Sequence, residues 1–161
     1  MKMRQILLIS ILSFAMIVSL TGCIIIPRHM NYEIDADDVS SVEIYDLRSS
    51  ETHDSGFHKS ETPVYTVEDD QITDFLSDLA EIQFTDTIVI TIAAVDPSFY
   101  YGDWVVRINH TDGSYSLISC RGYGETCDEN DQRTSSNHYG CEDDEWEQLI
   151  GNYVPADIFG E

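Results

Sequence analysis

The chain has 161 residues, with 8 Lys and Arg against 30 Asp and Glu, and a formal net charge of −22 at pH 7. This length suits one modest domain, and the sign of the charge argues against nucleic acid as a partner, because binding to phosphates starts from Lys and Arg. Hydrophobic residues make up 42% of the chain and aromatic residues 11%, which argues against a wholly disordered acidic protein.

The N-terminal segment has the features of a secretory signal peptide. Lys2 and Arg4 precede an almost continuously apolar run over residues 6–20. The run of about fifteen residues is shorter than the roughly 20 that a membrane-spanning helix needs. The segment is therefore predicted to direct export and not to span the membrane in the mature protein.

The apolar run ends at the tetrapeptide Leu20-Thr21-Gly22-Cys23, which resembles the lipobox of bacterial lipoproteins. The resemblance implies that Cys23 is diacylated and becomes the new N-terminus after residues 1–22 are removed. We therefore expect a protein held on the extracytoplasmic face of the cell membrane by a lipid on Cys23. The alternative is a plain signal peptide, or a short membrane anchor, with an accidental Cys. The cleaved chain would hold six basic residues against 30 acids, a net charge of −24.

The next segment, residues 24–38, is predicted to form a tether. Pro27 interrupts regular structure, the sequence becomes acidic, and no hydrophobic period predicts a buried face. A flexible coil of this length reaches roughly 20 Å. The predicted organisation is a signal peptide over 1–22, a lipidated Cys and acidic tether over 23–38, and one small domain over 39–161.

Periodicity predicts the first elements of this domain. Alternating side chains over 42–47 predict a strand, residues 49–62 a long polar loop, and residues 63–67 a short strand with Pro63 at its entry. Residues 68–80 are predicted to form an amphipathic helix with an acidic first turn. Its apolar stripe, at the spacing i, i+3, i+4, i+7, consists of Ile72, Phe75, Leu76 and Leu79.

A β-rich stretch follows the predicted helix. The β-branched content of residues 82–94 predicts a central strand, and alternation over 104–109 and 115–120 predicts two more. Asp112-Gly113 between them favours a two-residue hairpin loop. That loop would place Ile108 opposite Leu117 and Val106 opposite Ser119, with the apolar side chains of both strands on one face.

A second amphipathic helix is predicted behind the acidic run 142–145, ending near Gly151 or Pro155. Its stripe consists of Trp146, Leu149, Ile150 and Tyr153. The order of elements predicts an α+β fold, with an antiparallel or mixed sheet of about five strands and two helices packed on one face.

The layout over most of residues 40–154 resembles small Gram-positive lipoproteins that have no assigned activity. The resemblance rests on an acidic helix start with the stripe of residues 72–79 and on a hairpin of the type Asp112-Gly113-Ser114-Tyr115. These motifs are fold signals, so the resemblance implies an architecture and no activity.

Three cysteines remain besides Cys23, an odd number in a compartment that permits disulfides. Cys127 and Cys141 bracket a polar segment, and joining them would close a loop of about fifteen residues with a stabilisation of roughly 3 kcal/mol. That pairing is the favoured prediction, with Cys120 as a small buried hydrophobe. Pairing of Cys120 with Cys141 is the alternative.

Candidate metal sites do not fit the spacing that metals require. Among His110, Cys120, Cys127, His138 and Cys141, only the last two have the close spacing typical of zinc ligand pairs. The acidic residues after Cys127 lack the pattern of a calcium loop. We expect neither a metal nor a cofactor, although the high negative charge favours weak, delocalised cation binding.

Four aromatic residues precede or begin the predicted strand over 104–109: Phe99, Tyr100, Tyr101 and Trp104. Flat rings in this connection could form an exposed platform for a sugar ring or a peptide. The alternative is that Trp104 and one Tyr close the end of the hydrophobic core, which we regard as the better interpretation.

Familiar catalytic motifs are missing from the sequence: it contains no Gly-x-Ser-x-Gly elbow, no His-Glu-x-x-His and no phosphate-binding glycine loop. We expect a non-enzymatic lipoprotein with an interaction or envelope-associated domain, whose partner is an envelope protein or glycan. The alternative function is a surface module that captures a glycan, a peptide or a solute through the aromatic residues at 99–104.

Overall fold

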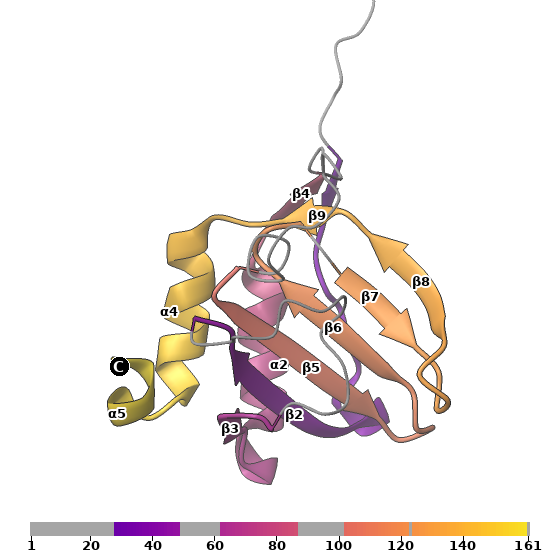
Figure 1. Ribbon diagram of the computed structural model, residues 1–161, viewed down its shortest axis with the longest axis horizontal. Coiled ribbons are helices and arrows are strands. Elements are labelled where there is room, and N and C mark those ends of the chain that lie inside the picture. The colour runs from indigo at the N-terminus through magenta and orange to yellow at the C-terminus, as the bar shows by residue number, and fades with distance from the viewer. Residues whose placement is uncertain (1–27, 49–61, 87–101, 123, 161) are drawn as a thin grey trace, which may run out of the picture.

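The computed structural model describes residues 28–48, 62–86, 102–122 and 124–160. Within these ranges the chain is an α+β fold with two antiparallel sheets, so the predicted fold class is confirmed (Figure 1). In chain order the elements are β1 (His29–Met30), η1 (Ala36–Asp38), β2 (Val39–Asp46), β3 (Tyr65–Thr66), η2 (Asp69–Gln71), α2 (Ile72–Glu81), β4 (Phe84–Asp86), β5 (Trp104–His110), β6 (Tyr115–Ser119), β7 (Gly124–Cys127), β8 (Arg133–Asn137), β9 (Tyr139–Gly140), α4 (Asp143–Tyr153) and α5 (Ala156–Phe159).

The larger sheet has six strands in the order β3-β2-β5-β6-β7-β8. β2 pairs with β5 along its whole length, from Val39 opposite His110 to Asp46 opposite Trp104. The short β3 adds to the outer edge of β2, and β7 and β8 continue the sheet beyond β6. β2 and β5 are therefore interior strands, which explains why most of their apolar residues are completely buried.

Alternate side chains of the larger sheet enter two separate apolar clusters. The first, which we call the helix-side core, contains sheet residues such as Val42, Val106 and Ile118 together with the stripes of α2 and α4. The second, which we call the opposite-face cluster, consists of Tyr45, Leu47, Val105, Tyr115, Leu117 and Cys127. The sheet thus separates two groups of buried residues.

Both predicted helices are present, and both predicted stripes face the helix-side core. All four stripe residues of α2 are buried, and so are Trp146, Leu149 and Ile150 of α4. Phe75 contacts the Tyr153 ring edge-on, with 5.0 Å between ring centroids, and this pair joins the two helices. α4 continues past Gly151 and ends at Tyr153, before Pro155.

The smaller sheet has the order β1-β4-β9 and corrects the predicted tether. Met30 pairs with Phe84, and Arg28 accepts a backbone hydrogen bond from Asp86 at 2.8 Å. Met30, Tyr32, Ile34 and Ala36 then pack against the helix-side core. The folded domain therefore begins by residue 28 and not at 39, because every second side chain of this segment is half-buried.

The hairpin between β5 and β6 has a different register from the predicted one. Ile108 pairs with Ser116 and Val106 with Ile118, a shift of one residue. His110 donates a backbone hydrogen bond to Ser114 at 2.8 Å, so the loop holds three residues, with Gly113 at φ +86°. A one-residue shift exchanges the faces of a strand. Leu117 consequently lies in the opposite-face cluster and Ile118 in the helix-side core.

Candidate functional site

Trp104 is buried, which agrees with the favoured interpretation that it closes the core and contradicts its place in an exposed aromatic platform. Its ring stacks on Phe159 with 5.4 Å between centroids and 15° between planes, and its carbonyl accepts a hydrogen bond from Trp146 Nε1 at 3.1 Å. Trp104 thus closes the end of the core and is not available to a ligand. Phe99, Tyr100 and Tyr101 lie outside the described residues.

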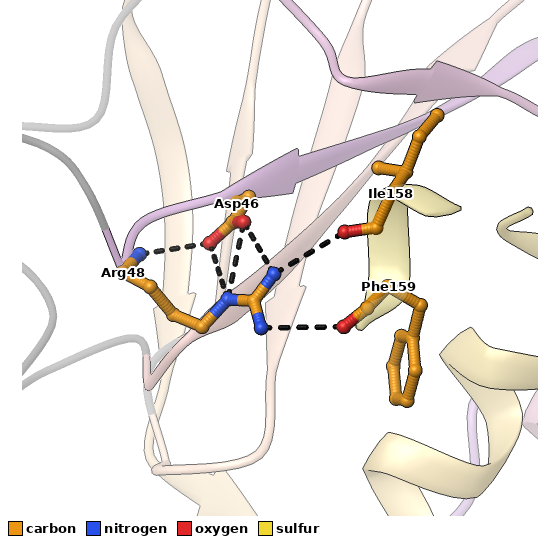
Figure 2. A network of polar contacts seen from close by, with 4 residues as sticks. All are labelled: Asp46, Arg48, Ile158 and Phe159. Atoms are coloured by element: carbon orange, nitrogen blue, oxygen red, sulfur yellow. Dashed lines mark hydrogen bonds and ion pairs between the residues drawn. The ribbon is translucent and has the colours of Figure 1, made fainter. Parts of the chain in front are cut away.

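Arg48 links the end of β2 to α5, as Figure 2 shows. Its guanidinium binds Asp46, with 2.7 Å between Nη2 and Oδ2, and donates to the carbonyls of Ile158 and Phe159 at 3.4 and 3.3 Å. The guanidinium carbon also lies 4.6 Å from the centre of the Trp104 ring. Hydrogen bonding to Asp46 raises the pKa of Arg48 above its ordinary value. The arrangement is a structural clamp on the C-terminal residues.

The structure has no disulfide among the three described cysteines, so the favoured bridge between Cys127 and Cys141 is not present in it. Cys127 belongs to the opposite-face cluster, whereas Cys141 packs against the helix-side core. The two therefore lie on different sides of the larger sheet, which the loop-length argument could not foresee. Cys23, the predicted lipidation site, lies outside the described residues.

The environment of the three thiols suppresses their ionisation. Burial and the carboxylates of Glu145, Asp143 and Glu142 raise the pKa of Cys141 to about 12. Burial likewise raises the pKa of Cys120, with a further contribution from Asp143, and that of Cys127. A nucleophilic cysteine needs the opposite shift, because the thiolate is the reactive form. These thiols are therefore poorly suited to act as catalytic nucleophiles.

A groove of about 250 Å³ lies between the C-terminal part of α2 and α4. Its lining residues are Asp78, Glu81, Ile82, Glu145, Gln148, Leu149 and Asn152. Asp78 Oδ2 accepts a hydrogen bond from the Tyr153 hydroxyl at 2.7 Å, which fixes one carboxylate at the groove. Burial, together with this hydrogen bond, raises the pKa of Tyr153. We call this feature the acidic groove.

A second groove, of about 590 Å³, lies on the other flank of α2. It is lined by the N-terminal segment and by α2 itself, with Glu33, Ile34, Asp35, Ala36, Thr73, Leu76, Ser77 and Ala80. The segment predicted to be a tether thus forms one wall of this groove. The acidic groove and this second groove therefore lie on opposite sides of α2.

The two helices carry a strong and one-sided charge. α2 and α4, both described in full, contain seven carboxylates and no Lys or Arg. The carboxylates are Asp74, Asp78, Glu81, Asp143, Asp144, Glu145 and Glu147. Two neighbouring helices without a cation between them present a negative potential to solvent. The absence of Lys and Arg from these two acidic segments was the signal in the sequence for the acidic groove. Helical periodicity alone places the carboxylates on exposed helix faces and does not show that the two faces meet.

Within the described part of the chain, no group of three or more His, Cys, Asp or Glu side chains is arranged to hold a metal ion. Nor does any helix in the described ranges have the length and apolar character needed to cross a membrane. The arrangement offers two grooves for non-covalent contact, and in the acidic groove the hydrogen bond from Tyr153 fixes one carboxylate, that of Asp78.

Comparison of the chain with protein-family models, with curated proteins and with solved structures finds no match.

Proposed function

We propose that this protein is an extracytoplasmic lipoprotein, anchored by acyl chains on Cys23, whose domain makes non-enzymatic contacts with a basic component of the cell envelope. One observation carries the anchor: basic residues, an apolar run and the sequence Leu-Thr-Gly-Cys at 20–23 directly precede a domain that begins by Arg28. Acyl chains hold such a domain on a membrane without a membrane-spanning helix.

The interaction role is supported by the acidic groove and by the chemistry of the thiols. Three carboxylates converge on the groove, from Asp78, Glu81 and Glu145, and amide side chains from α4 lie beside them. A negative surface attracts and orients a positively charged partner, such as a Lys- or Arg-rich segment. The raised pKa values of the three thiols favour a domain that binds over one that reacts.

The anchor is tested by metabolic labelling of cells with a clickable fatty acid. The wild-type chain should take up the label and remain in the membrane fraction, whereas Cys23→Ala should do neither, because it removes the acylated thiol. Ile24→Ala is the matched control, since it changes the neighbouring residue and leaves the thiol. Equal labelling of the wild type and Cys23→Ala would rule out the lipoprotein assignment.

The interaction role is tested by site-specific photo-crosslinking in intact cells. A benzoylphenylalanine at Gln148, an exposed residue that lines the acidic groove, should give a crosslinked adduct. The same probe at Ser135, an exposed residue of β8, is the control and should give none. Adducts at both positions, or at neither, would contradict a contact through the acidic groove.

A further inference from the structure

Cys120 and Cys141 belong to the same region of the core, although 20 residues separate them in the chain. Cys120 is a buried member of the helix-side core, and Cys141 is half-buried and packs against that same core. Cys127 lies in the opposite-face cluster. The larger sheet thus keeps one cysteine apart from the other two.

A backbone hydrogen bond joins the two neighbouring cysteines. The Cys141 amide donates to the Cys120 carbonyl at 2.9 Å. A hydrogen bond of this length holds the two backbones next to each other. Disulfides span about 4.4–6.8 Å between α-carbons, a separation that two residues joined by a backbone hydrogen bond can adopt.

Gly140 makes this close approach feasible. A β-carbon at this position would overlap the Cys120 carbonyl oxygen and would lie 2.9 Å from the Gly122 amide nitrogen. The chain leaving β9 therefore runs directly against the turn at 120–122, which a larger residue would push away. This contact fixes the backbone of Cys141 beside that of Cys120.

The electrostatic surroundings of the two thiols agree with this geometry. Asp143, in the first turn of α4, contributes to raising the pKa of both Cys120 and Cys141. The charge of Cys141 also raises the pKa of Cys120. Both thiols therefore respond to the same carboxylate, and one of them responds to the other.

We infer that Cys120 and Cys141 form an intramolecular disulfide in the mature protein and that Cys127 remains a thiol. The inference rests on the extracytoplasmic location proposed above, because disulfides persist in oxidising compartments. It reverses the pairing that loop length alone favours.

The bridge forms by thiol–disulfide exchange with an external disulfide, either a small-molecule disulfide or that of a thiol oxidoreductase. The half-exposed Cys141 loses its proton, and its sulfur attacks one sulfur of the oxidant, which releases the other as a thiolate. Cys120 then loses its proton and attacks the Cys141 sulfur in the mixed disulfide, which releases the second thiolate. Two protons and two electrons leave the protein, and the oxidant becomes two thiols.

Peptide mapping tests the pairing directly, because trypsin separates the cysteines. Cleavage after Arg107, Arg121 and Arg133 places each in its own peptide: Cys120 in 108–121, Cys127 in 122–133 and Cys141 in 134–161. The full chain in detergent is equilibrated in a mildly alkaline glutathione redox buffer, denatured, alkylated and digested without reduction. Mass spectrometry should find 108–121 joined to 134–161, two hydrogens lighter than the sum, and 122–133 alkylated.

Two variants separate the pairing from chance reactivity. Cys127→Ser should leave the crosslinked peptide unchanged, whereas Cys141→Ser should abolish it and leave Cys120 alkylated. Alkylation of all three cysteines, a link between 122–133 and 134–161, or links between two copies of the chain would each overturn the inference.

The same map of protein taken from cell membranes distinguishes this inference from the proposed location. A bridge in the isolated chain and in cells supports both. A bridge in the isolated chain that is missing from cells supports the pairing and contradicts the oxidising location. Loss of fatty-acid labelling with the bridge intact would contradict the anchor alone.

Discussion

Leu76 lies on the buried stripe of α2 and has an exposed fraction of 4%. Leu76→Ala should lower the free energy of unfolding by about 2–5 kcal/mol, because it removes buried methyl groups and leaves a cavity. Ser77→Ala, at the next and exposed position of α2, is the control and should change the stability by no more than about 0.5 kcal/mol. Urea denaturation with equal midpoints for the two variants would contradict the helical register.

Asp78, also on α2, illustrates what a periodic pattern does not reveal about single residues. The pattern assigns it to the solvent face, yet its carboxylate accepts a hydrogen bond from Tyr153 on α4. Such a contact depends on how two helices meet, and the sequence of either helix does not contain that information. The same holds for Gly140, where the neighbour that excludes a side chain is 20 residues earlier in the chain.

Gly140→Ala should destabilise the protein by about 1–3 kcal/mol, because the added methyl group collides with backbone atoms that cannot move independently. Gly151→Ala is the control and should change the stability in the opposite direction. Its β-carbon would meet only the Phe159 ring at 3.4 Å, and replacing a helical Gly by Ala should stabilise α4 by up to about 1 kcal/mol. Urea midpoints that shift in the same direction for both variants would contradict the close approach at Gly140.

At the scale of elements, the predictions succeed where a segment carries its own hydrophobic period. Both helices and the strands β2, β5 and β6 agree with the sequence because each has an apolar face of regular spacing. β8 has no such signal, since its residues are Arg, Thr, Ser, Ser and Asn, and most are exposed. β1 and β9 are two residues long and exist through their pairing with β4. Predicted segments over 49–61 and 87–94 lie outside the described residues.

The hairpin between β5 and β6 was predicted correctly as an element and wrongly in register. Asp-Gly suits both a two-residue loop and a three-residue loop with Gly in the left-handed region. Asp112 Oδ1 accepts hydrogen bonds from the Ser114 amide and hydroxyl, at 2.9 and 2.6 Å, and these bonds accompany the longer loop. The single residue of difference decides which cluster Leu117 and Ile118 enter.

The helix α5 has only four residues, and hydrogen bonds from Arg48 to two of its carbonyls hold it in place. Arg48→Ala should lower stability by about 1 kcal/mol, because it removes charge-assisted hydrogen bonds to two carbonyls at a partly exposed site. It should also speed carboxypeptidase removal of residues 156–161. Arg48→Lys keeps the positive charge and loses the planar fork, so its effect should be intermediate. Identical trimming of wild type and Arg48→Ala would contradict the clamp.

At the scale of the whole molecule, several buried phenols and thiols share one response to pH. Burial raises the pKa of Tyr45 and of Cys141 to about 12, from ordinary values of 10.0 and 9.0. Tyr32, Tyr115 and Tyr153 also have pKa values raised by burial. The folded protein therefore keeps protons that the unfolded chain releases in alkaline solution.

The free energy of unfolding should be unaffected by these groups below about pH 9 and should fall as the pH rises toward about 12. Urea denaturation across this range measures the effect, and phenolate absorbance follows the titration. Tyr45→Phe should flatten part of the decline, since it removes one of the responsible groups. A bridge between Cys120 and Cys141 would remove two thiols from the titration and flatten it further. Stability that stays constant throughout this range would contradict the burial of these groups.

The early start of the folded domain determines how far it can stand from a bilayer. With a lipid on Cys23, four residues lie between the anchor and Arg28, and the five fully extended steps from Cys23 to Arg28 span at most about 18 Å. The Debye length at physiological salt is about 8 Å, so anionic headgroups repel those carboxylates of the acidic domain that come within about this distance of the surface. Repulsion should turn the carboxylate-rich helices away from the lipid and leave Arg28 and His29 nearest to it. A partner must then bind close to the bilayer, because the short connection between Cys23 and Arg28 holds the domain near the membrane.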